Sequence, residues 1–137
     1  MSSKGVAVDF GSPMEVVVDA DLAENFARET GVSLEGNAAP IAYPALWLAQ
    51  PRLRDRVAQI CAEADALPVH ESQRFSYAAP LRQGVRYFLA IAARREAEPS
   101  RLVLDATLSD LQGAAIGRIE TVLRLVSRAN LPKKGDA

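Results

Sequence analysis

An almost continuous apolar run, residues 43–49 (Tyr-Pro-Ala-Leu-Trp-Leu-Ala), constrains the fold more than any other part of this sequence. Pro44 suits the first turn of a helix, and a helix that is apolar on every side must be covered by other elements. Pro51 lacks the amide proton that would continue the helical hydrogen bonds, so the helix must kink or restart there. One bent helix or two abutting helices are therefore predicted. Beyond Pro51, apolar residues recur at helical spacing at Leu53, Val57, Ile60 and Ala64.

A short strand and a short helix precede the apolar run. Residues 15–18 (Glu-Val-Val-Val) are mostly β-branched, which is typical of a strand, and Asp21 with Glu24 has the spacing of a capping box. Gly31 is suited to end the helix. Residues 32–42 have no periodicity, so we expect a loop that forms one wall of a site. The predicted apolar face of the helix carries Leu22, Ala23 and Phe26.

After Pro68 the period of the apolar residues changes from helical to about two. The alternation predicts four consecutive strands, joined by short turns. Strands connected in this way form an antiparallel sheet, which can cover the apolar helix. The sequence therefore predicts an α+β domain in which an antiparallel sheet wraps around a long central helix, an arrangement known as the hotdog fold. The four predicted strands are residues 69–77, 85–94, 102–109 and 115–126.

The length of the chain bounds its domain organisation. The chain has 137 residues, 49% of them hydrophobic, which suits a single domain with one core. We expect the ordered core to span about residues 9–128. The polar N-terminus and the basic tail that contains Lys133 and Lys134 are expected to be flexible.

Charge and composition argue against several classes of function. Lys plus Arg number 16 and Asp plus Glu 17, so the formal net charge is −1 and we expect no nucleic-acid partner. No apolar run approaches the about 18–20 residues of a membrane span, and the N-terminus has no apolar signal-peptide core. Cys61 is the only cysteine, so no intramolecular disulfide can form and we expect a cytoplasmic protein. Cys61 and His70 alone are too few for a structural zinc site, and no metal is expected.

Three ordered blocks of sequence resemble the N-terminal, dehydratase-like half of MaoC-type hydratases. Residues 69–84 (Val-His-Glu-Ser-Gln-Arg-Phe-Ser-Tyr-Ala-Ala-Pro-Leu-Arg-Gln-Gly) are similar to the family pattern His-Gly-Glu-Gln-x-Phe-x-Tyr-x-x-Pro-Leu-x-x-Gly-Asp, except that Val85 replaces the final Asp. Residues 25–31 (Asn-Phe-Ala-Arg-Glu-Thr-Gly) resemble the family's Phe-Ala-x-x-Thr-Gly element. Residues 39–46 (Ala-Pro-Ile-Ala-Tyr-Pro-Ala-Leu) resemble the entry to its central helix. The resemblance spans roughly residues 15–125.

This resemblance implies a dimeric hotdog protein that binds an acyl thioester between two subunits. Coenzyme A or phosphopantetheine would then carry the substrate, and no resident cofactor is implied. Catalytic members of the family have Asp-x-Asn-Pro-x-His directly after the Thr-Gly element. In this chain residues 32–40 (Val-Ser-Leu-Glu-Gly-Asn-Ala-Ala-Pro) follow and contain neither the Asp nor the His. The resemblance therefore implies a substrate-binding subunit that pairs with itself or with a catalytic hotdog subunit.

Candidates for acid–base chemistry are few. His70 is the only side chain that ordinarily titrates near neutral pH, and a hydrogen-bonding role is its structural alternative. Glu71 and Glu63 offer a carboxylate base, although a carboxylate on a half-exposed strand or helix is usually solvated. No residue is assigned as catalytic from the sequence.

Candidates for binding gather near the start of the predicted apolar helix and on the strand that follows it. Large apolar side chains at these places either wall an acyl channel or fill the core. Arg82 and Arg86 are candidates for contact with phosphates of coenzyme A, with ordinary surface as the alternative. Cys61 is interpreted as a buried structural thiol. The predicted substrate-binding residues are Tyr43, Pro44, Ala45, Trp47, His70 and Phe75.

Three functional hypotheses remain open at the level of sequence. The leading one is an acyl-thioester-binding hotdog protein that lacks the usual Asp/His dyad and serves as a substrate-binding subunit. The second is a self-sufficient homodimeric enzyme, either an acyl-CoA thioesterase or a 3-hydroxyacyl-CoA dehydratase that uses Glu63, Glu71 or His70. The third is an interaction protein with no acyl ligand and no catalytic activity.

Overall fold

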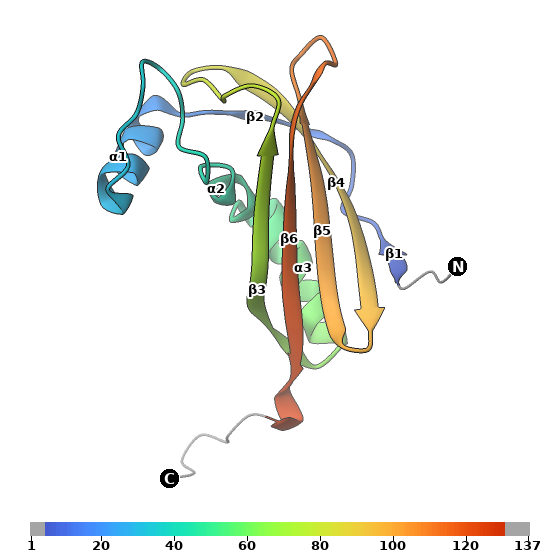
Figure 1. The fold of residues 1–137 in the computed structure, drawn as a ribbon. Coiled ribbons are helices and arrows are strands. Elements are labelled where there is room, and N and C mark those ends of the chain that lie inside the picture. The colour runs from blue at the N-terminus through green and yellow to red at the C-terminus, as the bar shows by residue number, and fades with distance from the viewer. Residues whose placement is uncertain (1–4, 131–137) are drawn as a thin grey trace.

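A curved antiparallel sheet with helices packed against one of its faces makes up most of the computed structural model, which describes residues 5–130 (Figure 1). The predicted flexible segments at residues 1–4 and in the tail around Lys133 and Lys134 lie outside the described residues. The strands are β1 (Val6–Val8), β2 (Met14–Val17), β3 (Ala66–Tyr77), β4 (Arg86–Ala97), β5 (Ser100–Ser109) and β6 (Ala115–Ser127). The helices are α1 (Ala20–Thr30), α2 (Ala45–Leu48), α3 (Pro51–Glu63) and the 3₁₀ turn η1 (Arg128–Asn130).

The sheet has the strand order β1-β4-β5-β6-β3, and β2 also pairs with β4. Every pairing is antiparallel. The four strands predicted from alternation are therefore confirmed, and they are consecutive in the chain from β3 to β6. β3 begins at Ala66, earlier than predicted, and includes Pro68. Proline is tolerated there because β3 is an edge strand that pairs only with β6 within the described part of the chain.

The N-terminal region differs from the expectations of the sequence analysis in two places. Residues 6–8 form strand β1, which pairs with residues 93–95 of β4 and was not predicted. The N-cap of α1 is Asp19, whose carboxylate accepts a hydrogen bond of 3.0 Å from the backbone N–H of Leu22, so the predicted capping box at Asp21 and Glu24 was wrong. Gly31 ends the helix with a φ of 73°, as predicted.

The buried face of α1 also differs from the prediction. Ala23 and Ala27 are buried, and Phe26 is half-buried, but Leu22 is 51% exposed. Figure 1 shows the reason: α1 lies away from the sheet, beyond α2, so only a narrow face of it meets other elements. A helix in that position buries small side chains and leaves a large one exposed.

The apolar run forms the centre of the core, as the sequence predicts. The run forms α2, and α3 abuts it, with Pro51 at the start of α3 after an extended Gln50. Trp47 is 3% exposed, and its indole N–H donates a hydrogen bond of 3.1 Å to the carbonyl of Val17. Tyr43 is 1% exposed, and its hydroxyl accepts a hydrogen bond of 3.0 Å from the backbone N–H of Asp19. The two aromatic residues therefore fasten α2 to the junction between β2 and α1.

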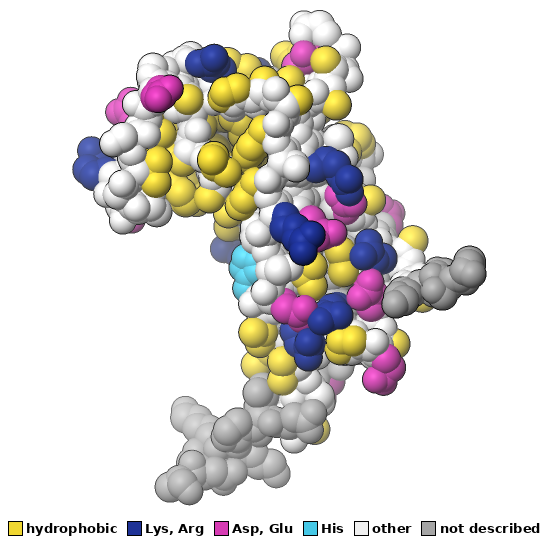
Figure 2. All heavy atoms as spheres, in the orientation of Figure 1, with side chains coloured by type: hydrophobic (Ala, Val, Ile, Leu, Met, Phe, Trp, Pro, Cys, Tyr) yellow, Lys and Arg dark blue, Asp and Glu magenta, His cyan; other side chains and the backbone are white. Residues whose placement is uncertain are grey.

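The outer face of the sheet, opposite the helices, carries paired charges. Arg118 pairs with Asp105, and Arg94 pairs with Glu96 at 3.0 Å. Figure 2 shows basic and acidic side chains intermixed over the strands on this face. Alternation explains the distribution, because successive residues of a strand point to opposite faces of the sheet.

We expect Trp47→Ala to lower the free energy of unfolding by about 3–5 kcal/mol, because it leaves a cavity in the core and an unpaired carbonyl at Val17. Urea unfolding followed by circular dichroism measures this change. Leu111→Ala is the control, since Leu111 is 46% exposed in the turn between β5 and β6, and its effect should stay within about 0.5 kcal/mol. Equal effects of the two substitutions would contradict the central position of Trp47.

Candidate functional site

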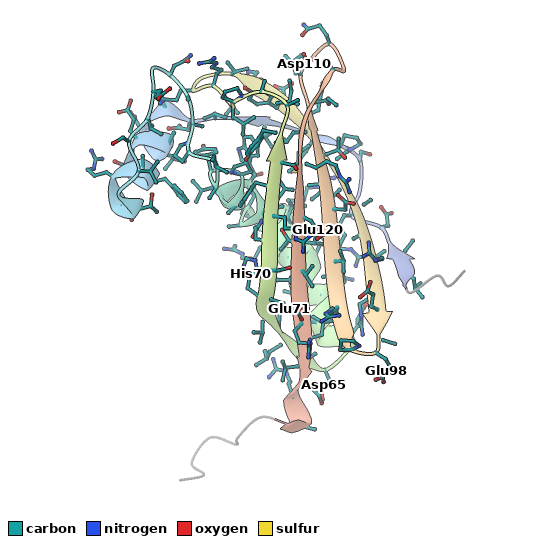
Figure 3. The ribbon with its side chains drawn as sticks, viewed as in Figure 1. Asp65, His70, Glu71, Glu98, Asp110 and Glu120 are labelled. Carbon is teal, nitrogen blue, oxygen red and sulfur yellow. The ribbon has the colours of Figure 1, made fainter. Side chains whose placement is uncertain are left out.

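Strand β3 contains an irregularity beside two of the candidate residues, His70 and Glu71 (Figure 3). Its register against β6 shifts between His70 and Ser72, so that Glu71 is an extra, bulged residue. His70 lies opposite Leu123, and Gln73 lies opposite Thr121. Residues 121 and 123 share one face of β6, because side chains alternate along a strand. The bulge therefore turns both His70 and Gln73 toward the face that the helices cover.

On the opposite face, Glu71 is held by two arginines. A carboxylate oxygen of Glu71 lies 2.7 Å from the guanidinium of Arg101, and the other lies 2.9 Å from that of Arg124. The hydrogen bond from Arg101, followed by that from Arg124, lowers the pKa of the Glu71 carboxyl below its usual range. Glu71 is thus an ionised group on the outer face of the sheet and fixes the bulge there.

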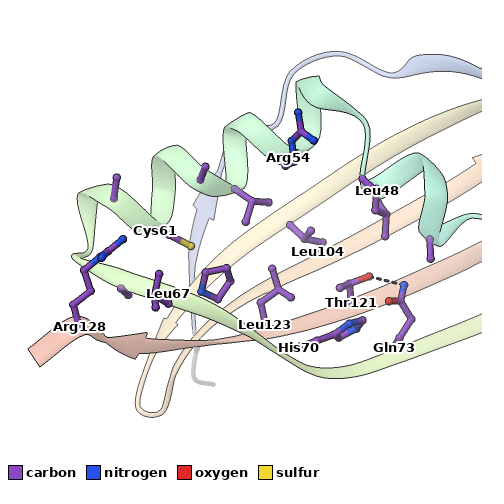
Figure 4. Close-up of a pocket in the computed structure, with 17 residues that line it drawn as sticks. Leu48, Arg54, Cys61, Leu67, His70, Gln73, Leu104, Thr121, Leu123 and Arg128 are labelled. Atoms are coloured by element: carbon purple, nitrogen blue, oxygen red, sulfur yellow. Dashed lines mark hydrogen bonds between the residues drawn. The ribbon is translucent and has the colours of Figure 1, made fainter. Parts of the chain in front are cut away.

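A groove runs between the helices α2 and α3 on one side and the strands β3 and β6 on the other (Figure 4). Its volume is about 520 Å³. Small side chains on the helices and on β3 explain why helix and strand do not close against each other. These small residues are Ala45, Ala49, Ala58, Ala62 and Ala66, and the larger apolar residues of the wall are Leu48, Val57, Leu67, Leu104 and Leu123.

The uncharged polar residues of the groove wall lie together. The side-chain amide of Gln73 donates a hydrogen bond of 2.9 Å from Nε2 to Oγ1 of Thr121, drawn as a dashed line in Figure 4. Thr121 is 5% exposed and is the one buried polar residue in the described part of the chain. His70 lies next to this pair in the groove, and no described residue forms a hydrogen bond with its side chain.

Charged residues reach the groove only at its margins. Arg54 of α3 and Arg128, which follows β6, belong to the wall, and no Asp or Glu does so among residues 5–130. Cys61 also lines the groove, and burial raises the pKa of its thiol. Neutral thiol is therefore its dominant form near neutral pH. Among the described residues, no three His, Cys, Asp or Glu side chains gather in a way that could hold a metal ion.

Of the residues predicted to bind substrate, the structure brings Ala45 and His70 to the groove. Tyr43, Pro44 and Trp47 are buried in the core and do not line it. Phe75 faces the helices beyond the groove, where its ring stacks on Tyr77 with centroids 6.4 Å apart. These placements favour core packing for the aromatic candidates, which is the alternative that the sequence left open.

The other candidates lie away from the groove. Glu63 is exposed at the end of α3 and does not line the groove. Arg82 donates a hydrogen bond of 3.0 Å to the side chain of Asn37, and Arg86 pairs with Glu15 at 2.8 Å. The predicted loop of residues 32–42 follows α1, but none of these residues lines the groove.

Sequence reasoning missed Gln73 and Thr121. A signal for Thr121 was present, because it is a polar residue within the apolar alternation of Ile119, Leu123 and Leu125. The position of Gln73 depends on the bulge, which shifts the alternation in β3 and leaves no comparable trace in the sequence.

A second apolar surface lies beside α1. Figure 2 shows hydrophobic side chains gathered in a hollow next to this helix. Three large side chains in α1 and the loop after it are strongly exposed: Leu22 by 51%, Val32 by 48% and Ile41 by 68%.

No described helix is both long and apolar enough to cross a membrane.

Comparison with known proteins identifies the fold. The sequence matches no protein-family model and no curated protein sequence. A chain of the C-terminally truncated (3R)-hydroxyacyl-ACP dehydratase complex HadBC of Mycobacterium tuberculosis superposes with a TM-score of 0.63 at 14% identity, over 88% of this chain and 96% of that chain. The 1,4-dihydroxy-2-naphthoyl-CoA thioesterase Slr0204 of Synechocystis has a TM-score of 0.56 at 15% identity, over 91% and 86%.

A third solved structure is longer than this chain. HtdX of Mycobacterium tuberculosis has a TM-score of 0.64 at 16% identity, over 90% of this chain and 52% of its own. At these identities the likeness concerns the fold alone. These neighbours are hotdog proteins, so the predicted hotdog fold is confirmed.

We expect Glu71→Gln to destabilise the protein at neutral pH and to lose this effect in acid. The pKa of Glu71 is lower in the folded than in the unfolded chain, so the ionised carboxylate stabilises the fold above the ordinary Glu pKa of about 4.3. That stabilisation disappears as the pH falls through the lowered folded-state pKa. Urea unfolding of both proteins between about pH 7 and pH 3 tests this. A difference that grows toward acid pH would show the opposite sign and refute the role of the two arginines.

Proposed function

We propose that this chain binds an acyl thioester in the groove between α3 and β3 and acts as a substrate-binding subunit of a hotdog dimer. The observation that carries the proposal is the composition of the groove wall. It is apolar along most of its length, its volume of about 520 Å³ lies within the range typical of ligand pockets, and its uncharged polar side chains His70, Gln73 and Thr121 lie together while Arg54 and Arg128 stand at its margins. A hydrocarbon chain with one polar end fits such a surface, because burial of the chain removes apolar area from water.

Structural neighbours support the acyl-thioester class. They include a (3R)-hydroxyacyl-ACP dehydratase and a 1,4-dihydroxy-2-naphthoyl-CoA thioesterase, both of which act on acyl thioesters. The substrate of this chain is inferred from that class and from the groove, and its carrier would be coenzyme A or an acyl carrier protein.

A binding role is favoured over self-sufficient catalysis by the placement of the carboxylates. Hydration, dehydration or hydrolysis by acid–base catalysis needs a base that reaches the reacting atoms, and a histidine base is usually oriented by a carboxylate. His70 lines the groove, but Glu71 points to the outer face and Glu63 lies outside the groove. The described part of the groove wall offers no carboxylate partner for His70. A second subunit is the natural source of the missing catalytic groups.

The second subunit would adjoin the edge strand β3. This strand pairs with β6 on one side, and no described strand pairs with its other side. Leu67 and Val69 near its start are 37% and 50% exposed, and the groove opens beside them. A long exposed edge with apolar side chains is a site where another chain adds. Alone in solution a second copy takes this place, and a catalytic hotdog protein takes it where one is present.

We expect Ala58→Trp to abolish binding of a long-chain acyl-CoA, because Ala58 lines the groove and an indole ring there fills it. Gln59→Trp is the matched control on the next residue of α3, which does not line the groove. Calorimetric titration measures affinity. A thermal shift gives a second readout, since ligand at about 100 times its dissociation constant adds about 2.7 kcal/mol of stability. Equal binding by the two variants, or none by the unsubstituted protein, would contradict the proposal.

We expect the purified chain to sediment as a dimer at micromolar concentration and Val69→Lys to shift it toward monomer, because a charged side chain on an edge strand opposes pairing. Val6→Lys is the control, since Val6 is 73% exposed on β1, at the far edge of the sheet. Analytical ultracentrifugation provides the measurement. A monomer at every concentration tested would count against a second copy on β3.

A further inference from the structure

We propose that His70, Gln73 and Thr121 form a polar contact point that holds an oxygen atom of the acyl ligand, either the thioester carbonyl or a hydroxyl on the chain. The inference rests on the proposed function and names the part of the ligand that the groove recognises. It follows from the positions of the three side chains, from the hydrogen bonds that they have left to make, and from the apolar wall around them.

The bulge in β3 and the pairing of β3 with β6 bring the three side chains together. The bulge at Glu71 turns His70 and Gln73 to the same face of β3. Thr121 stands opposite Gln73 on β6, and the two side chains are joined by their hydrogen bond of 2.9 Å. Figure 4 shows this pair and the His70 ring on the strand side of the groove, across from Leu48. The contact point is therefore held by strands and not by a loop.

The hydrogen bonds leave this cluster with unused capacity. Oγ1 of Thr121 accepts from Gln73, so its hydroxyl proton remains to be donated. Gln73 retains its Oε1 acceptor and a second amide proton, and His70 retains both ring nitrogens. No other described residue takes up these groups. Water can serve them while the groove is open.

Binding of a ligand under a second subunit would remove that water. A polar group left unpaired in a dry site costs about 1–3 kcal/mol, so a purely hydrocarbon ligand would be disfavoured at this level of the groove. A carbonyl oxygen can accept from Thr121, Gln73 or His70, and a hydroxyl can in addition donate to Oε1 of Gln73. Toward Cys61 and Leu67 the wall is mostly apolar, with Arg128 at its margin, which suits the hydrocarbon part of the ligand.

Three ligands of equal chain length test the proposal: a saturated acyl-CoA, the corresponding 3-hydroxyacyl-CoA, and the S-alkyl-CoA thioether that lacks the carbonyl. Thr121→Val and Gln73→Leu should each weaken an oxygen-bearing ligand about three- to tenfold and should leave the affinity for the thioether equal or higher. Loss for both acyl-CoA ligands identifies the carbonyl as the bound oxygen. Loss for the 3-hydroxyacyl-CoA alone identifies the hydroxyl.

Controls separate a binding effect from a folding effect. Thr107→Val makes the same change on the outer face of β5, outside the groove, and should not alter any affinity. Thr121→Ser keeps the hydroxyl and should retain the ligand preference. If the unsubstituted protein binds the thioesters and the variants weaken all three ligands equally, or none, this inference fails while the proposed function stands. If the unsubstituted protein binds none of them, both fail.

Discussion

Coverage of the apolar helix α2 and of the apolar face of α3 is the constraint on which the rest of the structure depends. Trp47 and Tyr43 are buried, and the apolar faces of β4, β5 and β6 pack in the same core cluster. The hydrogen bond from Trp47 to the carbonyl of Val17 also draws β2 toward α2. The sheet is thereby held at a fixed distance from the helices, and that distance permits a groove wherever the intervening side chains are small.

The groove arises from a mismatch between the two layers at the edge strand. Along most of β5, large side chains such as Leu102 and Leu108 are fully buried and fill the core. Beside β3 the helices present alanines, and the strand contributes Ala66 and Pro68, so a space remains. The bulge at Glu71 then places polar side chains on the wall of that space, while the ion pairs of Glu71 hold the bulge from the outer face. One irregularity thus serves structure on one face and ligand contact on the other.

The sequence predicts the architecture well because most of it depends on local periodicity. Alternation located β3 to β6, and Pro51 located the break between α2 and α3. Strand β1 was not foreseen, because a run of residues 6–8 is too short to carry a pattern and is defined by its pairing with β4. The contact between Gln73 and Thr121 joins residues that are 48 positions apart and depends on a register shift, so periodicity alone does not predict it. Tyr43 and Trp47 show a further limit of the sequence. Its pattern is the same whether two aromatic side chains line a pocket or pack in the core behind it.

The most direct test of the central claim is to locate the acyl chain on the protein. Isotope-filtered NMR of the labelled protein with an unlabelled long-chain acyl-CoA detects contacts between the hydrocarbon and individual methyl groups. The account predicts contacts to Ala62, Leu67 and Leu123 in the groove. Contacts confined to the exposed side chains of Leu22 in α1 and Ile41 in the loop after it would contradict it.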